Sequence, residues 1–472
     1  MAYLSNKNYF PLRSYLFTFS DSQITNLNRI SKGIYNLSGY RAIINTNIPY
    51  KLIDDLFFIF ISTALVILFF IGYKIVQSNK ISQGSIVKWG IVFSILMTIA
   101  IPSHSSDLYG YIARGTQQSI YHQNPYFKTV DEIKDYQHDP RFLNFMWTHQ
   151  GTTYGPVFVF ITKVITYLSN NNFFVSFINF KLLNLTVFLL LILFVLKLNQ
   201  AKDLYLIAWN PFILIQGLWN CHNDLISGVI IFFGIYMLIK SKNNNKYFWS
   251  VFSLTIAAAI KYVSILIIPI IGFYLLQKKT SSKVFVDLFL GFCSGILLVL
   301  IFSVDYLIPL RNLSMNNASK LISNISLVHK SLISTILTSI KYFCHWLAIN
   351  CDLLKVQSML KCFFYTMFLL FYLWTLFKKK TSLIFEISLI LFIFFAFTIA
   401  KFHSWYLLNL IILIPFLKKG LFKNILITLS LSHVYALTFL DQAKILNYIS
   451  MTLVPVIFVF FKERHKRHFF FS

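Results

Sequence analysis

The chain has 472 residues, of which 57% are hydrophobic and only 12% are charged. A soluble domain carries about 25% charged residues, so this composition excludes an ordinary soluble globular protein. The formal net charge of +26 would favour nucleic acid binding in a soluble protein. Here, however, the lysines lie in short clusters between apolar runs, which is typical of the cytoplasmic loops of membrane proteins. We therefore expect contact with membrane lipids and no nucleic acid partner.

Apolar runs of about 17–25 residues predict membrane-spanning helices. In chain order, the predicted segments are 56–73, 86–102, 173–198, 203–219, 224–240, 247–276, 284–305, 359–377, 382–400, 403–417, 421–439 and 446–461. The run 247–276 is long enough for two helices, with a break near Lys261 or Pro269. The sequence thus predicts an all-α polytopic membrane protein with roughly 11–13 transmembrane helices.

These segments divide the chain into three parts: a polar, basic N-terminal segment (1–51), a transmembrane domain (52–461) and a basic tail (462–472). Two large loops, 103–172 and 306–358, interrupt the domain. We expect no cleaved signal peptide, because no short apolar run near the N-terminus is followed by a small-residue cleavage site. The five cysteines form no CxxC pair and show no metal spacing, and we expect them to be small packing residues.

Clusters of lysine and arginine predict the orientation of the chain. They lie at 240–246, 278–283, 378–380, 418–423 and 462–467. If 247–276 forms a helical hairpin, all five clusters lie on one side, which the positive-inside rule makes cytoplasmic. The short segments 220–224 and 401–405, together with the loop 306–358, then lie on the extracytoplasmic side.

The side of the loop 103–153 depends on the moderately apolar segment 154–168. If this segment lies in the membrane interface, the loop is extracytoplasmic; if it spans, the loop is cytoplasmic. An extracytoplasmic loop puts Lys74, Lys80 and Lys88 inside, as the rule prefers, but leaves the basic N-terminal segment outside. The charges alone leave both arrangements open.

The first candidate site follows directly after the run 86–102. Asp107, Tyr111 and Arg114 have i, i+4 and i+7 spacing, so a helix would place them on one face. A carboxylate at the membrane surface can take a proton from an attacking hydroxyl group. The alternative is that Asp107 merely caps the start of a helix.

A second cluster, His222-Asn223-Asp224, lies between two apolar runs. Polar residues in such a position usually line a cavity or a polar surface of a membrane protein. His222 and Asp224 could coordinate a metal ion or bind sugar hydroxyl groups. The alternative is an interfacial turn with a helix cap at Asp224.

Two further candidates lie later in the chain. Lys261, inside an apolar run, should have an anionic partner. We favour a lipid phosphate over snorkelling to the lipid headgroups or pairing with Asp287 or Glu386. His403, together with Lys401, could contact a phosphate or a sugar, and Trp405 could stack on a sugar face, although aromatic residues are also common interface anchors.

The motifs occur in the order Asp107, Asn-Pro-Tyr (124–126), Tyr-Gly-Pro (154–156), Asn-Pro (210–211), His-Asn-Asp (222–224), Lys261 and Trp-Tyr (405–406). This order resembles the polyprenol-phosphate-mannose-dependent mannosyltransferases of the GT-C superfamily, over roughly residues 86–417. The long polar N-terminus and Cys221, where a small residue such as glycine is more usual, depart from the family pattern.

The resemblance implies a GT-C-like fold with an active site outside the cytoplasmic leaflet of a bacterial inner membrane. It implies that Asp107 is the catalytic base and that Asp224 is the second acidic site. It also implies an interfacial helix after the first loop, and hence an extracytoplasmic loop 103–172. The expected reaction transfers a mannose-like hexose, with inversion, from a polyprenyl-phosphate donor to a glycan or glycolipid acceptor.

We expect Tyr111, Arg114, His222, Asn223, Asp224, Lys261, His403 and Trp405 to bind substrate. A divalent metal ion is a candidate cofactor, but cationic side chains could stabilise a phosphate leaving group without one. A flippase or transporter of lipid-linked sugars would share the lysine and the aromatic residues but should show internal repeats and a polar site near the bilayer midplane. A polysaccharide polymerase or ligase is a third candidate.

Overall fold

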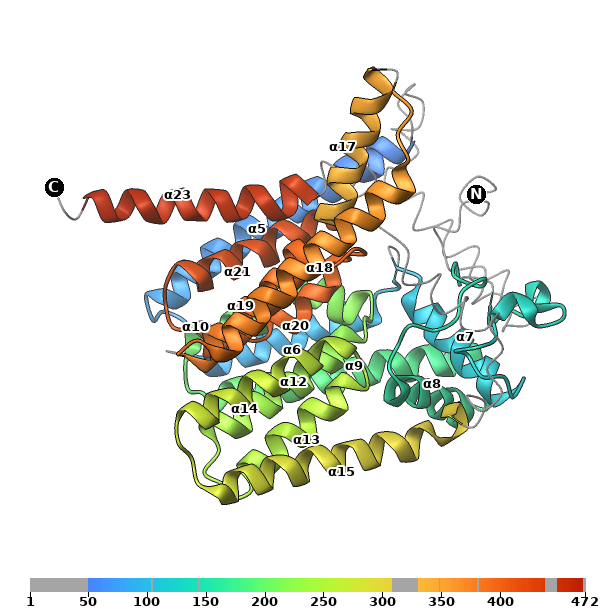
Figure 1. Cartoon of the computed structure of the whole chain (residues 1–472), viewed down its shortest axis with the longest axis horizontal. Helices are drawn as coiled ribbons and strands as arrows, with labels where there is room; N and C mark the ends of the chain where they lie inside the picture. The colour runs from blue at the N-terminus through green and yellow to red at the C-terminus, as the bar shows by residue number, and fades with distance from the viewer. Residues whose placement is uncertain are drawn as a thin grey trace.

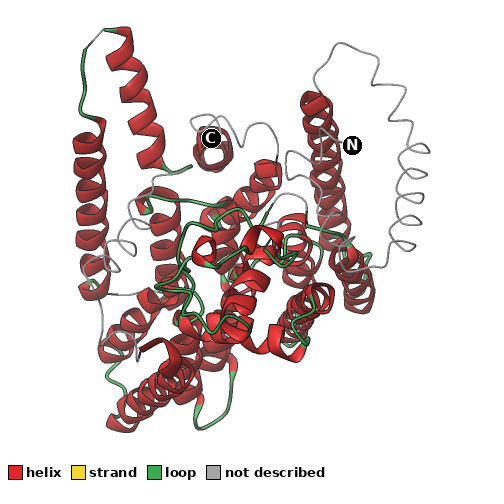
Figure 2. Cartoon of the chain, turned by 90° about the vertical axis from the view of Figure 1, so that its right-hand side faces the viewer, coloured by secondary structure: helices red, strands yellow, loops and turns green. Residues whose placement is uncertain are grey.

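The computed structural model describes residues 50–102, 105–142, 145–307, 330–347, 349–379, 382–437 and 448–469. All regular structure in these ranges is helical, as Figure 2 shows. The predicted all-α class is confirmed. The polar segment predicted at 1–51 lies almost entirely outside the described residues.

The helices follow the predicted apolar runs closely. In chain order they are α5 (Tyr50–Gln77), α6 (Gln83–Ile99), α7 (Asp107–Ser119), α8 (Pro156–Leu168), α9 (Phe173–Leu196), α10 (Ala201–Ala208), α11 (Pro211–Ile213), α12 (Asp224–Lys240), α13 (Lys246–Ala258), α14 (Ile267–Gln277), α15 (Ser282–Leu307), α17 (Leu332–Trp346), α18 (Leu353–Phe377), α19 (Leu383–Ile393), α20 (Leu408–Ile411), α21 (Leu421–Ser432) and α23 (Val454–Phe469). Three π-helical turns interrupt or extend them: η3 (Leu214–Trp219), η6 (Phe394–Thr398) and η11 (Ile449–Leu453).

Within the described residues, four helical stretches are long and apolar enough to cross a membrane: Phe58–Gln77, Phe173–Leu196, Ser282–Val304 and Leu353–Phe377. Six shorter apolar helices pack among them. The chain is therefore an all-α polytopic membrane protein, while the larger count of 11–13 spans stays a prediction.

The helices run between two ends of a bundle, and α12 and α13 define these ends. α12 begins at Asp224 and, at 1.5 Å per residue, carries the chain about 25 Å to Lys240. α13 returns from Lys246 so that the Nζ atom of Lys261, just beyond it, lies 3.0 Å from an Asp224 carboxylate oxygen. We call the end with Asp224 the acidic end and the end with residues 240–246 the basic end.

The other basic clusters lie at the basic end. The last turn of α14 meets the last turn of α18, where Gln277 donates a hydrogen bond to the carbonyl oxygen of Lys378 at 2.9 Å. Lys423, at the start of α21, pairs with Asp203 near the start of α10 at 2.6 Å. Figure 1 shows the α14–α15 turn and the end of α23 on the same side, opposite α7 and α8. The predicted hairpin at 247–276 is present and breaks at Lys261, whereas Pro269 lies within α14.

Helix α8 begins and ends at the acidic end. At its start, the Gly155 and Val157 amides donate to the carbonyl oxygens of Ile260 and Ala259, next to Lys261. After its end, α9 begins with Phe173, which stacks on Tyr109 of α7 at 6.3 Å between ring centroids. Because α8 does not cross the bundle, the loop that carries α7 lies at the same end as residues 220–224.

The loop region 306–358 contains a helix, and the expectation about the cysteines needs correction. Residues 332–346 form helix α17, whose first turn is capped by Ser331 accepting a hydrogen bond from the Ser334 amide. Cys344 and Cys351 form a disulfide bond at the tip of the α17–α18 hairpin, so these two cysteines are not simple packing residues. The sequence lacked a CxxC signal because the two residues are seven positions apart.

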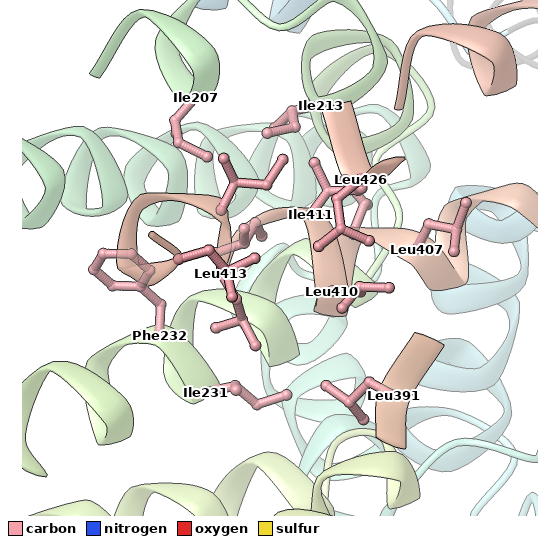
Figure 3. Packing of buried hydrophobic residues seen from close by; sticks show 14 of the residues in the cluster. Ile207, Ile213, Ile231, Phe232, Leu391, Leu407, Leu410, Ile411, Leu413 and Leu426 are labelled. Carbon is pink, nitrogen blue, oxygen red and sulfur yellow. The ribbon is translucent and has the colours of Figure 1, made fainter. Parts of the chain in front are cut away.

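The main hydrophobic core lies where α12 packs against α20, which in turn packs against α21. Figure 3 shows Phe232 of α12 beside Leu413, and Ile231 of α12 facing Leu391 of α19, and all four are fully buried. This packing fixes the direction of α12 and therefore the position of Asp224 at its first residue. The buried packing of α12 therefore determines where the acidic end begins.

Candidate active site

Asp107 is the first residue of α7, and its carboxylate faces residues that follow more than 100 positions later. Its Oδ2 atom lies 3.0 Å from Nδ1 of His222. Ser106 takes the cap position, so the carboxylate is available for this contact. Burial opposes ionisation, but the hydrogen bond and charge of His222, with Lys261 and Lys401, hold the pKa of Asp107 below its usual value.

The loop from Asn220 to Asp224 has an unusual backbone conformation. It follows the π-helical turn η3, a feature that is frequent at functional sites. Cys221 has a φ of 60°, the left-handed region that glycine adopts without strain. His222, Asn223 and Asp224 are all fully buried.

Asp224 is the partner of Lys261. Its Oδ2 atom lies 3.0 Å from the lysine Nζ, and its Oδ1 atom accepts a hydrogen bond from Asn409 at 2.9 Å. Neither carboxylate considered as an alternative to the lipid phosphate is the partner: Glu386 pairs with Lys378 at 2.9 Å, and no ion pair joins Lys261 to Asp287 in the described residues. The loop geometry at the α13 break directs Lys261 to Asp224.

Aromatic rings surround these charges. The Nζ of Lys261 lies 4.5 Å from the ring centroid of Tyr406 and 5.6 Å from that of Tyr154. Trp405 stacks on His222 at 4.0 Å and on His403 at 4.4 Å, with interplanar angles of 12° and 14°. A sugar that stacks on Trp405 would have to compete with these imidazole contacts.

Tyr111 and Arg114 occupy different surroundings, although both lie on α7. The hydroxyl group of Tyr111 accepts a hydrogen bond from the backbone N–H of Asn223 at 3.0 Å, which joins α7 to the buried loop. Arg114 instead donates to Gln117 at 2.9 Å and to the carbonyl oxygen of Gln150. Burial lowers the pKa of Arg114 to about 10. The structure thus gathers every predicted site residue except Arg114, which supports the first loop.

The prediction from the sequence gave three residues of the site little or no role. Asn409 lies in an apolar run, and a lone buried amide there is the signal that could have revealed it. Tyr154 looked like part of a turn motif only. Lys401 lies 4.8 Å from the ring centroid of Trp147, and burial lowers its pKa.

Several buried polar atoms of the site lack a hydrogen-bond partner within the described residues. They are Nε2 of His222, Nδ2 of Asn223 and Oδ1 of Asn409. Buried polar atoms are nearly always paired in proteins, and exceptions call for an explanation. A polar substrate such as a sugar would supply hydroxyl groups to such atoms.

The donor set does not fit a bound metal ion. Among the described residues, no group of three or more His, Cys, Asp and Glu side chains is arranged to hold one. Asp107 is engaged by His222, and Asp224 is neutralised by Lys261. His222 and Lys261 therefore occupy positions from which these carboxylates could ligate a metal.

The fold and site define a membrane-embedded helical protein with a buried polar centre at one end of its bundle. Residues 43–277 match the family model described as alpha-(1->6)-mannopyranosyltransferase, N-terminal domain, of the MptA_B family. Over this half of its length the chain belongs to that family, and the resemblance to mannosyltransferases is confirmed. The chain matches no curated protein and no solved structure. It is thus a membrane glycosyltransferase of the mannosyltransferase type.

Proposed function

We propose that the protein transfers a mannose-like hexose, with inversion, from a polyprenyl-phosphate donor to a hydroxyl group of an extracytoplasmic glycan or lipid. The observation that carries this proposal is the contact of the Asp107 carboxylate with His222, 3.0 Å apart, beside the cations of the acidic end. A low carboxyl pKa keeps Asp107 ionised and able to accept a proton.

In the proposed reaction, Asp107 accepts the proton of the acceptor hydroxyl group as its oxygen attacks the anomeric carbon of the donor. The bond between that carbon and the phosphate oxygen breaks, and the lipid phosphate leaves with the electron pair. Because attack and departure occur on opposite faces, the configuration inverts. His222 keeps the carboxylate oriented throughout.

The lipid phosphate needs a cation, and the two lysines of the site differ in this respect. Lys261 is already neutralised by Asp224. Lys401 lies beside Trp147 and has no carboxylate within ion-pair distance in the described part of the chain. We therefore propose that Lys401, next to His403, receives the phosphate first and that Lys261 contributes from the other side.

Two features support an extracytoplasmic site. The basic clusters lie at the opposite end of the bundle, as expected for the cytoplasmic side. The disulfide Cys344–Cys351 precedes α18, whose last turn reaches the basic end, so it lies toward the acidic end. Disulfide bonds persist in oxidising compartments outside the cytoplasm.

Labelling of Ser105→Cys by a membrane-impermeant maleimide from outside tests the extracytoplasmic position of the site. Protection of this cysteine until the membrane is permeabilised would contradict that position.

The position of the site favours a transferase over a transporter. The polar residues gather at one end of the bundle, whereas a transporter is expected to bind its substrate near the midplane. Net transfer of radiolabelled mannose from a polyprenyl-phosphate donor to an acceptor, in vesicles that contain the purified protein, separates the two functions. Movement of intact donor without transfer would indicate a transporter.

The decisive variant is Asp107→Asn, which keeps the size of the side chain and removes the base. We expect a loss of kcat of at least about 100-fold, the usual contribution of a general base. Asp203→Asn, at the basic end, is the matched control and should keep its activity per folded protein. A wild-type transfer rate in Asp107→Asn would show that Asp107 is not the catalytic base. Because the donor set does not fit a metal, we expect the transfer rate to be unchanged by EDTA.

A further inference from the structure

Lys181 is a buried lysine in the middle of α9 that the proposed reaction does not use. Its side chain is 3% exposed, and its helix is apolar enough to cross a membrane. A charged residue in such a helix is costly and usually has a function. In the described part of the chain, no carboxylate lies within ion-pair distance of Lys181. Its charge must therefore be satisfied in another way.

Backbone carbonyl groups accept hydrogen bonds from the ammonium group of Lys181. The Nζ atom donates to the carbonyl oxygens of Leu218 and Trp219, both at 2.8 Å, at the end of η3. It also reaches the carbonyl oxygen of Met97, near the end of α6, at 3.5 Å. The last carbonyl groups of a helix have no partner within the helix and attract positive charge. Lys181 thus joins the ends of two helical segments.

A second side chain of α9 completes this contact one turn later. The amide of Asn184 donates to the carbonyl oxygen of Gly217 at 2.8 Å and to that of His222 at 3.3 Å. Lys181 and Asn184 are three residues apart, so they lie on the same face of the helix. Together they hold the backbone on both sides of the turn that contains Cys221.

These two segments lead to the two acidic residues of the site. The end of α6 leads to Asp107, and the end of η3 leads to His222 and Asp224. We propose that Lys181 is a positioning residue whose ammonium group fixes the ends of α6 and η3, and thereby the 3.0 Å contact between Asp107 and His222. The structural part of this inference stands alone; its effect on rate rests on the proposed function.

The native thiol of Cys221 offers a test that does not depend on activity. This side chain is 1% exposed, in the turn that Lys181 and Asn184 hold. Replacing Cys293 and Cys362 by serine leaves it as the one unpaired thiol of the described residues. The rate of its reaction with methyl methanethiosulfonate, measured in membranes, then reports how often the turn opens.

We expect Lys181→Met to react at least about tenfold faster than the parent protein, since the turn loses its charged contacts. Lys181→Arg keeps the charge, so the reaction rate of Cys221 in this variant should lie between the rates in the parent protein and in Lys181→Met. Asn179→Ala is the matched control on the same helix: Asn179 donates to Ser169 at 2.9 Å, away from the turn. It should react as slowly as the parent.

In transfer assays, Lys181→Met should lower kcat by about 100-fold with little change in KM, because misplacement of a catalytic group by about 1 Å costs this much. Lys181→Arg should recover part of the rate. Unchanged reactivity of Cys221 in Lys181→Met would overturn the inference, as would an unchanged kcat. If Lys181→Met does not accumulate, Asn184→Ala takes its place, and an unreactive Cys221 there overturns the inference. If Cys221 reacts faster in Lys181→Met but the parent protein itself shows no transfer activity, the positioning role of Lys181 is upheld and the proposed function is rejected.

Discussion

Loss of the lysine from the Asp224–Lys261 pair should destabilise the protein strongly. The two side chains lie 3.0 Å apart and are 0% and 20% exposed. At this separation, two unit charges attract by about 5 kcal/mol at an effective dielectric constant of about 20. Removing one partner of a buried pair typically costs about 3–5 kcal/mol, because the other charge is left uncompensated. We expect this cost for Lys261→Met, since Asn409 provides only a neutral hydrogen bond.

The double variant Asp224→Asn/Lys261→Met separates pairing from catalysis. It removes both charges and should regain most of the lost stability, while transfer activity stays low. The pair Asp203–Lys423, 2.6 Å apart at the basic end, is the matched control. Lys423→Met should also lower stability, but the folded protein should keep its transfer rate.

The measurements are thermal unfolding in detergent and transfer rate per folded protein, for the single and double variants of both pairs. Unfolding of Lys261→Met at the wild-type temperature would contradict this expectation. A double variant less stable than both single variants would contradict it as well. Either result would mean that Lys261 is not held by Asp224 and serves only the substrate.

Three further outcomes follow from the geometry. The pKa of Asp107 is held low, so its charge is present above about pH 4 and is lost as the pH falls through the depressed value. His222→Gln removes a major support of that charge, and the acid limb of kcat/KM should move to higher pH; an unmoved limb would show that His222 does not act on Asp107. Cys221→Gly should keep wild-type activity, whereas Cys221→Val, whose β-branched side chain is strained further at a φ of 60°, should lower the unfolding temperature; equal unfolding temperatures would contradict this. Gly155→Ala should lower the unfolding temperature, because a Cβ atom there would overlap the backbone after α13, while Gly272→Ala, with no atom within 4 Å, should not; equal effects would disprove the argument.

The candidate site could be predicted in large part because its residues are costly exceptions to an apolar pattern. His222, Asp224 and Lys261 stand out in a chain with few charges, since a membrane helix tolerates such residues only with a partner. Asn409 is just as buried, yet one amide in an apolar run is a weak signal. Arg114 has the right spacing from Asp107, but its length lets it reach Gln150 in the first loop instead.

Hydropathy and motif order were enough to define most of the apolar helices, although not α17, together with the hairpin at 247–276 and the mannosyltransferase family. These are local properties: a span depends on the length of an apolar run, and a motif on neighbouring residues. Which residues meet depends on how distant helices pack. Only the packed bundle could show that α8 turns back at the acidic end, that Lys261 pairs with Asp224, and that Cys344 and Cys351 are joined. Contacts such as the one between Asp107 and His222, 115 residues apart, arise from the direction of whole helices, which no local pattern records.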